Sequence, residues 1–206
     1  MKNDMPEAKP ASAFYRDHVK RVIDLVIAVP VLVVAAIPMA IVALAVKLDS
    51  PGPVLFKQDR LGKDGKVFKM LKFRSMCVGA EKTGSGVYSG KNDARVTRVG
   101  RFIRATSLDE LPQLFNILRG DMSIVGNRPL PLYEAERLTA DDCIDRFIAP
   151  AGLTGLWQVE ERGKGGDMSA EERKQLDIRY GQTYNFSLDM KIIFRTLTAF
   201  VQKDNV

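Results

Sequence analysis

The sequence is poor in the residues that build most metal centres and disulfide frameworks. It has one histidine, His18, and two cysteines, Cys77 and Cys143, among 206 residues. With a single histidine, a zinc site with two or more histidine ligands is excluded. The cysteines do not stand in a paired metal-type spacing, so a disulfide framework is unsupported, which suits a reducing compartment. Any metal would be a hard ion such as Mg²⁺, held by carboxylates.

Acidic residues are scarce in one part of the chain. Between Lys57 and Arg104 there are thirteen lysine or arginine residues against four acidic residues, a net charge of +9. Such a basic stretch favours polyanionic partners, namely phosphates, anionic lipid or nucleic acid. The whole chain is 46% hydrophobic and 27% charged, which excludes a disordered chain and a protein with many membrane spans.

Charged residues are absent from residues 25–46, a run of 22 residues. As a straight helix this run would be about 33 Å long, enough to cross a bilayer core of about 30 Å. Pro30 and Pro38 interrupt it, and each proline predicts a kink because it removes a backbone donor and clashes with the preceding turn.

Both flanks of this apolar run are basic, with Arg16, Lys20 and Arg21 before it and Lys47, Lys57 and Arg60 after it. Because basic flanks favour the cytoplasmic side, a straight span would place one of them on the wrong side. A hairpin broken near Pro30 would keep both flanks in the cytoplasm. These features alone favour the hairpin and the single span equally.

The rest of the chain predicts a mixture of short strands and helices. Residues 1–13 are predicted to form a flexible tail. Runs at 54–60 and 66–73 around Gly62-Lys63-Asp64-Gly65 predict a β-hairpin. Helices are expected from 107 or 109 to 118, at 138–147, at 169–180 and at 187–202, with an extended loop at 122–132 and a Gly-rich loop at 162–167. The last helix is amphipathic, with an apolar stripe of Leu188, Ile192, Ile193, Leu197, Phe200 and Val201 opposite a polar face of Asp189, Lys191, Arg195 and Gln202. The apolar stripe favours packing on the core over a position on the membrane surface.

Asp109 and Glu110 are adjacent carboxylates that follow four arginines and open a predicted helix. Helix N-termini attract anions, and the arginines suit phosphate. Capping explains the same residues without any catalysis, either with Asp109 as the N-cap or with Ser107 and Glu110 as a capping box.

Four ordered motifs decide between these interpretations. They are Lys72-Phe-Arg-Ser-Met76, Ser107-Leu-Asp-Glu-Leu-Pro-Gln113, Gly120-Asp-Met-Ser-Ile-Val-Gly126 with Arg128-Pro129, and Gly152-Leu-Thr-Gly-Leu-Trp-Gln-Val159. Together they resemble the bacterial sugar transferase family, the small monotopic phosphoglycosyl transferases. The resemblance extends from about Asp17 to the C-terminus.

The resemblance implies an α+β fold that is mostly helical. Residues 14–48 would form a re-entrant membrane helix-break-helix with the break at Pro30. Residues 49–206 would form a compact cytoplasmic catalytic domain with the small β-hairpin and membrane-associated amphipathic helices. The protein would then be monotopic in the bacterial inner membrane, with its catalytic domain facing the cytoplasm.

The resemblance also implies the reaction. A sugar 1-phosphate would pass from a UDP-sugar to polyprenyl (undecaprenyl) phosphate with release of UMP, as the first membrane step of glycoconjugate or exopolysaccharide assembly. Asp109 would be the nucleophile of a covalent intermediate, and Asp109 and Glu110 would hold Mg²⁺. Arg104 and Arg128, and with less support Lys72 and Arg74, would contact phosphate or nucleotide; guanidinium groups suit phosphate oxygens.

Two departures from the family pattern stand out. Asn127 replaces the first proline of the usual Pro-Arg-Pro, which leaves the rigidity of the loop open, since proline fixes φ and asparagine does not. The run 157–166 also differs from the common continuation. The identity of the sugar is not predicted, and self-association through the apolar hairpin is an open expectation.

Two other functions remain as alternatives. The same reaction could proceed in one ternary step with Asp109 as a base. A membrane-tethered protein that binds polyanions is the non-enzymatic alternative, but the basic stretch lacks the interleaved aromatic residues of a nucleic-acid interface, so no nucleic acid is expected.

Overall fold

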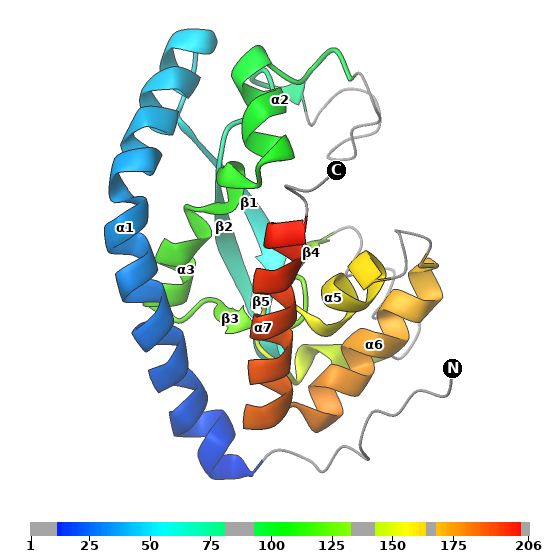
Figure 1. Ribbon diagram of the computed structural model, residues 1–206. Coiled ribbons are helices and arrows are strands. Elements are labelled where there is room, and N and C mark those ends of the chain that lie inside the picture. The colour runs from blue at the N-terminus through cyan, green and yellow to red at the C-terminus, as the bar shows by residue number, and fades with distance from the viewer. Residues whose placement is uncertain (1–11, 81–92, 133–142, 164–167, 203–206) are drawn as a thin grey trace. The chain divides into compact units, whose positions relative to one another are not determined.

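The computed structural model describes residues 12–80, 93–132, 143–163 and 168–202 (Figure 1). Most of the tail predicted at 1–13 lies outside these residues, as do 138–142 of the helix predicted at 138–147 and the end of the 162–167 loop. The fold is a mixture of helix and sheet and is 61% helical, as the sequence predicts.

By their internal contacts the residues form two compact units. The first unit comprises Met1–Ala28, Asp59–Phe68 and Ile117–Val206, and the second comprises Val29–Gln58 and Lys69–Asn116. The domain boundary predicted between residues 48 and 49 stays a prediction.

The apolar segment is a single helix. A π-helical turn, Tyr15–Val19, leads into α1, Lys20–Asp49, which continues through both Pro30 and Pro38. The helix-break-helix expected at Pro30 is therefore not seen, because a single proline in a long helix removes one hydrogen bond and does not have to end the helix. The re-entrant topology stays a prediction.

Of the described residues, those of Tyr15–Asp49 form the stretch long and apolar enough to cross a membrane. A core helix of a soluble protein passes the same test, but such a helix is mostly buried. Here only 17% of the most apolar window is buried. Large apolar side chains such as Val34 and Ile37 are 78% and 74% exposed. The exposed apolar surface of α1 is consistent with association with a membrane.

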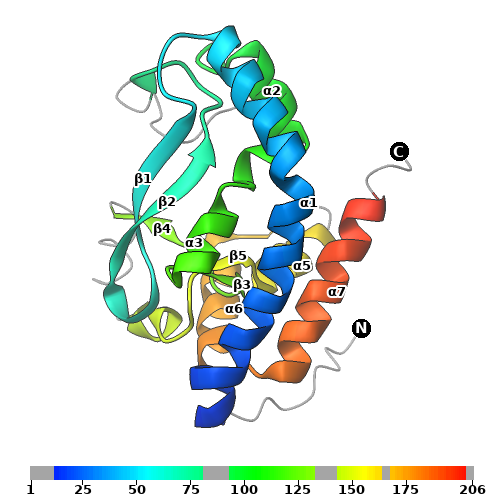
Figure 2. The same ribbon diagram turned by 90° about the vertical axis from the view of Figure 1, so that its left-hand side faces the viewer.

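The predicted hairpin is confirmed by β1, Leu55–Leu61, and β2, Val67–Phe73. A short turn at Lys63–Gly65 joins them, and Asp64 and Gly65 adopt the left-handed backbone that a tight turn needs, with φ of 54° and 71°. A third strand, β4 (Leu130–Pro131), pairs antiparallel with the end of β1, so the strand order is β2-β1-β4 (Figure 2). The loop expected at 122–132 thus contains strands.

The core of the second unit forms where α1 meets the hairpin and a helix that follows it. Val42 and Val46 of α1 pack with Phe73 of β2 and with Ile103 of α2, Arg98–Ala105. The Asp49 carboxylate accepts a hydrogen bond of 3.1 Å from the Val99 backbone N–H near the start of α2. These contacts hold the segment that carries the acidic pair.

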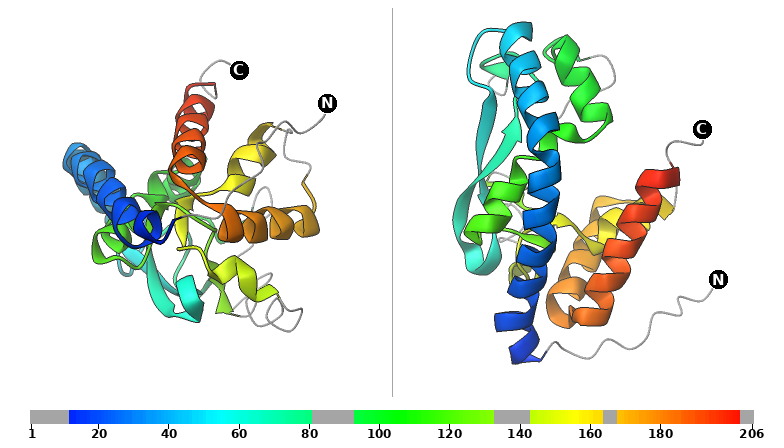
Figure 3. Two further views of the ribbon diagram at one scale, coloured as in Figure 1. Left: turned by 90° about the horizontal axis from the view of Figure 1, so that it is seen from below. Right: turned by 60° about the vertical axis from the view of Figure 1, so that its left-hand side comes forward.

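The first unit is built around two short parallel strands, β3 (Ser123–Val125) and β5 (Gly152–Thr154). Their backbones approach so closely that a Cβ on Gly152 would lie 2.2 Å from the Gly126 nitrogen, which explains both glycines. Three helices follow the strands: α5 (Leu156–Gly163), α6 (Ala170–Thr183) and α7 (Phe186–Gln202). Helices α6 and α7 diverge from the turn that joins them, and α5 contacts both (Figures 1 and 3). The predicted starts of α6 and α7 are confirmed to within one residue.

The polar side of α7 is not wholly exposed, contrary to the pattern in the sequence. Asp189 is 2% exposed, and its carboxylate accepts hydrogen bonds from Lys20 Nζ at 2.5 Å, Tyr15 Oη at 2.6 Å and Tyr180 Oη at 2.7 Å. Within the first unit this buried ion pair attaches the start of α1 to α7. Leu197, assigned to the apolar stripe, is 61% exposed. Packing on the core therefore holds for part of the stripe, including the buried Ile192.

Candidate active site

The segment before the acidic pair makes a sharp change of direction. Helix α2 starts at the N-cap Thr97, whose side chain accepts a 2.9 Å hydrogen bond from the Gly100 N–H. After α2, Ser107 adopts the left-handed conformation, with φ of 58°. A β-carbon is strained in that region, so Ser107 is held there by its surroundings. The chain then forms a 3₁₀ turn, Leu108–Glu110, that carries both carboxylates.

The predicted single helix from 107 or 109 to 118 is therefore two elements. The 3₁₀ turn is followed by α3, Gln113–Arg119, and Gly120 ends the helix with a φ of 89°. The end at Gly120 is as predicted. The start differs, and Ser107 makes no side-chain cap hydrogen bond, so the capping box of Ser107 with Glu110 is not present.

The two carboxylates have different surroundings. Asp109 is 8% exposed, whereas the Glu110 side chain is 23% exposed and forms an ion pair with Lys72, with 2.7 Å between Lys72 Nζ and Glu110 Oε1. Lys72 lies on β2, 38 residues earlier in the chain. The structure thus brings three predicted site residues together in the second unit.

Burial raises the pKa of the Asp109 carboxyl above its ordinary value. The positive charges of Lys72 and, more weakly, Arg104 act in the opposite direction, and the neighbouring Glu110 raises the pKa further. Arg104 therefore belongs to the same electrostatic environment, and its guanidinium also lies 3.7 Å from the Met76 sulfur. A carboxylate that is poorly hydrated and flanked by cations is suited to attack a phosphorus atom whose oxygens those cations bind.

Asn116 is a residue of this site that sequence reasoning missed. It is fully buried in α3, its Oδ1 accepts from the Leu71 N–H at 2.9 Å, and its Nδ2 donates to the Lys69 carbonyl at 2.8 Å. These bonds tie α3 to the part of β2 that presents Lys72. No local signal marks a single asparagine in a helix as such a link.

Arg74, predicted to contact phosphate, binds backbone carbonyls in the structure. It is 5% exposed and donates hydrogen bonds to three carbonyls at the end of α1: Pro51 at 2.6 Å, Ser50 at 2.8 Å and Val46 at 3.2 Å. A guanidinium in this position satisfies carbonyls that the helix leaves unpaired and complements its dipole. Phosphate contact by Arg74 stays a prediction, but its Nη1 and Nη2 atoms donate to these carbonyls, and its Nε is buried without a hydrogen-bond partner.

Arg128 belongs to the first unit, so the structure describes it apart from the acidic pair. Its loop is held by Asn127, whose Nδ2 donates to the Arg146 carbonyl at 2.7 Å and to the Asp177 carbonyl at 2.8 Å. Arg146 forms a buried ion pair with Asp177 and donates to the Arg128 carbonyl at 3.3 Å. Hydrogen bonds of the asparagine thus restrain the loop at the position where the resemblance in the sequence leads us to expect a proline.

The acidic pair could hold Mg²⁺ together with a substrate. Within 12–80, 93–132, 143–163 and 168–202 no group of three or more histidine, cysteine or acidic side chains is suited to a metal. Asp109 and Glu110 supply two carboxylates, which fits Mg²⁺ because this ion commonly binds one or two carboxylates together with substrate phosphates and water. The magnesium site at this pair stays a prediction.

The chain matches the profile described as "Bacterial sugar transferase" over residues 15–203. It belongs to the bacterial sugar transferase family. Curated relatives agree with this family assignment. A protein of Caulobacter vibrioides named "UDP-glucose:undecaprenyl-phosphate glucose-1-phosphate transferase" is 44% identical over 90% of this chain and 71% of its own length.

Two further relatives are longer proteins. One of Klebsiella pneumoniae with the same name is 41% identical over 89% of this chain and 40% of its own length. The "Undecaprenyl-phosphate galactose phosphotransferase" of Salmonella typhimurium is 37% identical over 96% of this chain and 42% of its own length. This bacterial sugar transferase chain therefore spans about two fifths of these two relatives.

Proposed function

We propose that this sugar transferase is a phosphoglycosyl transferase that moves a sugar 1-phosphate from a UDP-sugar to undecaprenyl phosphate and releases UMP. The observation that carries the proposal is the 3₁₀ turn in which the buried Asp109 stands beside the Glu110–Lys72 ion pair. The names of the relatives supply the two substrates, with glucose in some and galactose in others. The donor is therefore a UDP-hexose.

The reaction has two displacements at one phosphorus atom. A carboxylate oxygen of Asp109 attacks the phosphorus that bears the sugar, an O–P bond forms, and the bond to the bridging oxygen breaks as UMP leaves with the electron pair. An oxygen of undecaprenyl phosphate then attacks the same phosphorus, and the carboxylate of Asp109 leaves. Dividing the transfer allows the water-soluble donor product to depart before the lipid reacts.

The other residues of the site are proposed to bind the substrate phosphates and to orient the acidic pair. Lys72 holds Glu110 in place through its ion pair, and Arg104 and Arg128 are proposed to bind phosphate oxygens. Asp109 and Glu110 would hold Mg²⁺, which would supply charge neutralisation at the phosphate oxygens. The exposed apolar surface of α1 supports a position of this helix in the membrane. Both basic flanks are proposed to lie on the cytoplasmic side of the cytoplasmic membrane, which requires α1 to bend back near Pro30 when it inserts.

Mass spectrometry of the intact protein tests the covalent step. Incubated with Mg²⁺ and the UDP-sugar alone, the wild type should release UMP and gain the mass of one hexose phosphate on Asp109. Asp109→Asn should show no adduct and lose nearly all turnover, because the amide is not a nucleophile. Asp59→Asn, an exposed change of the same kind on β1, should behave as the wild type.

Each outcome has a distinct meaning. UMP release only when undecaprenyl phosphate is also present, with no adduct, would replace the covalent route by the direct ternary step. An active Asp109→Asn enzyme would refute the role of Asp109. A folded wild type that binds polyanions but releases no UMP from any UDP-hexose would refute the transferase assignment. A panel of UDP-glucose, UDP-galactose and their N-acetylated forms would identify the donor.

A further inference from the structure

Strand β2, which presents Lys72, has one edge that no other strand of the described residues covers. The strand order is β2-β1-β4, so β1 pairs with one edge of β2 only. At the two ends of the hairpin, the Gly62 N–H donates to the Lys66 carbonyl and the Arg74 N–H donates to the Val54 carbonyl. The residues of β2 that pair with β1 are therefore the even-numbered ones. Because residues of an antiparallel strand alternate in this way, the N–H and C=O groups of the odd-numbered residues point to the uncovered edge.

The side chain of Asn116 pairs with this edge as a neighbouring strand would. Its Oδ1 accepts from the Leu71 N–H at 2.9 Å, and its Nδ2 donates to the Lys69 carbonyl at 2.8 Å. An amide group carries an acceptor and a donor side by side, which matches an N–H and a C=O two residues apart on a strand edge. Asn116 is fully buried, so without its amide the buried Leu71 N–H would lose its acceptor in a place that water does not reach.

Asn116 joins the two segments that carry the ion pair of the site. In β2, Lys72 follows Leu71 directly, and its Nζ lies 2.7 Å from Glu110 Oε1. Asn116 belongs to α3, Gln113–Arg119, which begins three residues after Glu110. The amide and the ion pair are thus two links between the same two segments. Losing the amide link should therefore displace Lys72 relative to the acidic pair.

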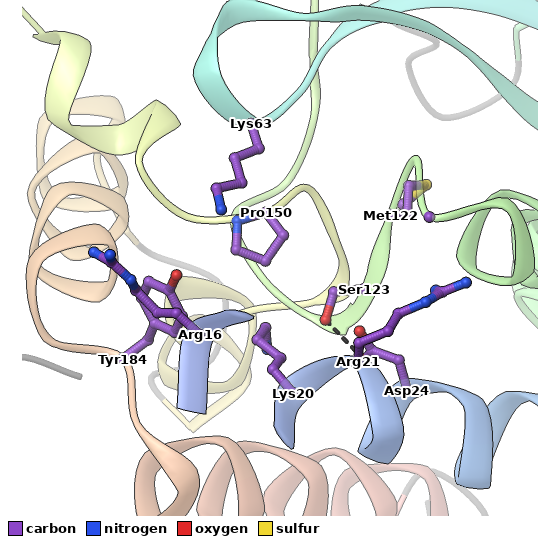
Figure 4. A pocket seen from close by; sticks show the side chains of 10 residues that line it. Arg16, Lys20, Arg21, Asp24, Lys63, Met122, Ser123, Pro150 and Tyr184 are labelled. Atoms are coloured by element: carbon purple, nitrogen blue, oxygen red, sulfur yellow. Dashed lines mark hydrogen bonds between the residues drawn. The ribbon is translucent and has the colours of Figure 1, made fainter. Parts of the chain in front are cut away.

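The other end of α3 is held separately, within the first unit. Arg21, which extends from the first turns of α1 in Figure 4, donates to the carbonyls of Ile117 at 2.5 Å and Leu118 at 2.7 Å. A guanidinium suits these carbonyls because the last turn of a helix leaves them without an intrahelical partner. The amide of Asn116 therefore acts on the part of α3 that leads back to the acidic pair.

We propose that Asn116 is a positioning residue for sugar transfer, which acts through Lys72. Its amide sets the place of β2 against the segment that begins with the acidic pair, and the Lys72–Glu110 ion pair then orients the carboxylates. The inference rests on the proposed function of Asp109 and Glu110. Asn116 itself touches two backbone groups of β2 and is not a catalytic residue.

A double-mutant cycle tests whether Asn116 acts through Lys72. The kcat and KM for UMP release are measured for the full-length wild type, Asn116→Leu, Lys72→Met and the double variant, well below the Tm of each. Leucine keeps the branched shape of asparagine without a donor or acceptor. We expect Asn116→Leu to lower kcat about tenfold with little change in KM, because a small displacement of an orienting group is costly. In the Lys72→Met background the same change should lower kcat by less than about twofold.

Asn185→Leu is the matched control. Asn185 Nδ2 donates to the Thr183 carbonyl at 3.1 Å, and its Oδ1 accepts from the Leu188 N–H at 3.0 Å. The same substitution there also removes two hydrogen bonds to the backbone, but at the turn between α6 and α7. It should lower Tm and leave kcat unchanged. If Asn116→Leu does not fold, Asn116→Ser replaces it in the cycle, since a hydroxyl is too short to bridge Lys69 and Leu71.

Hydrogen exchange at the Leu71 amide gives a readout that does not depend on activity. In the wild type this N–H should exchange slowly, because it is bound to a buried side chain. Exchange at Leu71 should become faster in Asn116→Leu and stay slow in Asn185→Leu. Fast exchange at Leu71 in the wild type would overturn the contact on which the proposal is built.

The outcomes of the cycle separate the inference from the proposed function. If Asn116→Leu lowers kcat by the same factor with and without Lys72, the residue is only structural and the positioning role is refuted, while the transferase stands. A loss of kcat in Asn185→Leu as large as that in Asn116→Leu would refute it too. A wild type that releases no UMP would refute the transferase and, with it, any role of Asn116 in catalysis.

Discussion

Replacing Arg146 by methionine tests the buried ion pair behind the Arg128 loop. The side chains of Arg146 and Asp177 are 3% and 5% exposed. Methionine keeps much of the volume but removes the charge and the hydrogen bonds to Asp177 and to the Arg128 carbonyl. Asp177 then remains as a buried carboxylate without its partner, which is the costly half of a broken buried ion pair.

The size of the effect follows from the pKa of Asp177. Burial raises this pKa from 3.8 to about 6, although Arg146 and Arg128 act to lower it. A folded-state pKa above the unfolded value means that the stability from this group is complete below about pH 4. It is lost as pH rises to about 6, a change of about 3 kcal/mol in the wild type. Without Arg146 the folded-state pKa rises further, so Arg146→Met should continue to lose about 1.4 kcal/mol per pH unit above pH 6.

Urea unfolding in a mild detergent measures the difference, with the single tryptophan, Trp157 of α5, as the fluorescent probe. At pH 8 we expect Arg146→Met to be less stable than the wild type by about 3–5 kcal/mol. At pH 5 the loss should be much smaller, because the carboxyl is protonated in both proteins. Adding Asp177→Asn to Arg146→Met should recover most of the loss at pH 8.

A matched control is available in the same unit. Arg195 pairs with Glu160 at 2.6 Å but is 42% exposed, so Arg195→Met should change stability by less than about 1 kcal/mol at either pH. A loss in Arg146→Met that is the same at pH 5 and pH 8 would show that packing, and not an unpaired charge, is responsible. Failure of Asp177→Asn to rescue it would refute the reasoning as well.

Substitutions at two further positions of the second unit, Arg74 and Ser107, give further tests. Arg74→Met should lower the free energy of unfolding by about 3 kcal/mol, because three carbonyls at the end of α1 lose a charged donor. The KM for the UDP-sugar should stay unchanged. A raised KM with unchanged stability would instead support the phosphate contact that the sequence suggests. Ser107→Gly should keep or slightly raise Tm, because glycine has no β-carbon to be strained at a φ of 58°. Ser107→Val should cost about 1–2 kcal/mol, because a β-branched side chain is strained more than serine in this conformation. Equal Tm values for the two Ser107 variants would contradict the strain.

Several elements could be predicted because their signals are local. The Asp-Gly turn between two β-prone runs marks the hairpin, and Gly120 marks the end of α3. Ser169 and Glu172 form a capping box at the start of α6, and the signal for it lies within four consecutive residues. Neighbouring residues largely determine such turns and helix ends, so the sequence alone is enough to locate them.

The sequence predicts which residues belong to the candidate site, but it does not predict their backbone conformation or burial. Its motifs identify Asp109 and Glu110, and they include Lys72. That Asp109 is buried on a 3₁₀ turn after a left-handed Ser107 depends on packing that no motif expresses. The same holds for Asn116, which lies 45 residues from the strand residue whose N–H it accepts.

Charged residues show most clearly what cannot be predicted from the sequence. In the sequence, Arg74 suits phosphate and Asp189 belongs to the polar face of an amphipathic helix. In the structure, Arg74 binds the end of α1, and Asp189 is buried against Lys20, 169 residues away. The family, the apolar helix, the hairpin and the acidic pair can be recognised without a structure, since each depends on residues close together in the chain. Which charges are buried and which are paired depends on the folded chain, because those partners lie far apart in the sequence and meet only when the chain folds.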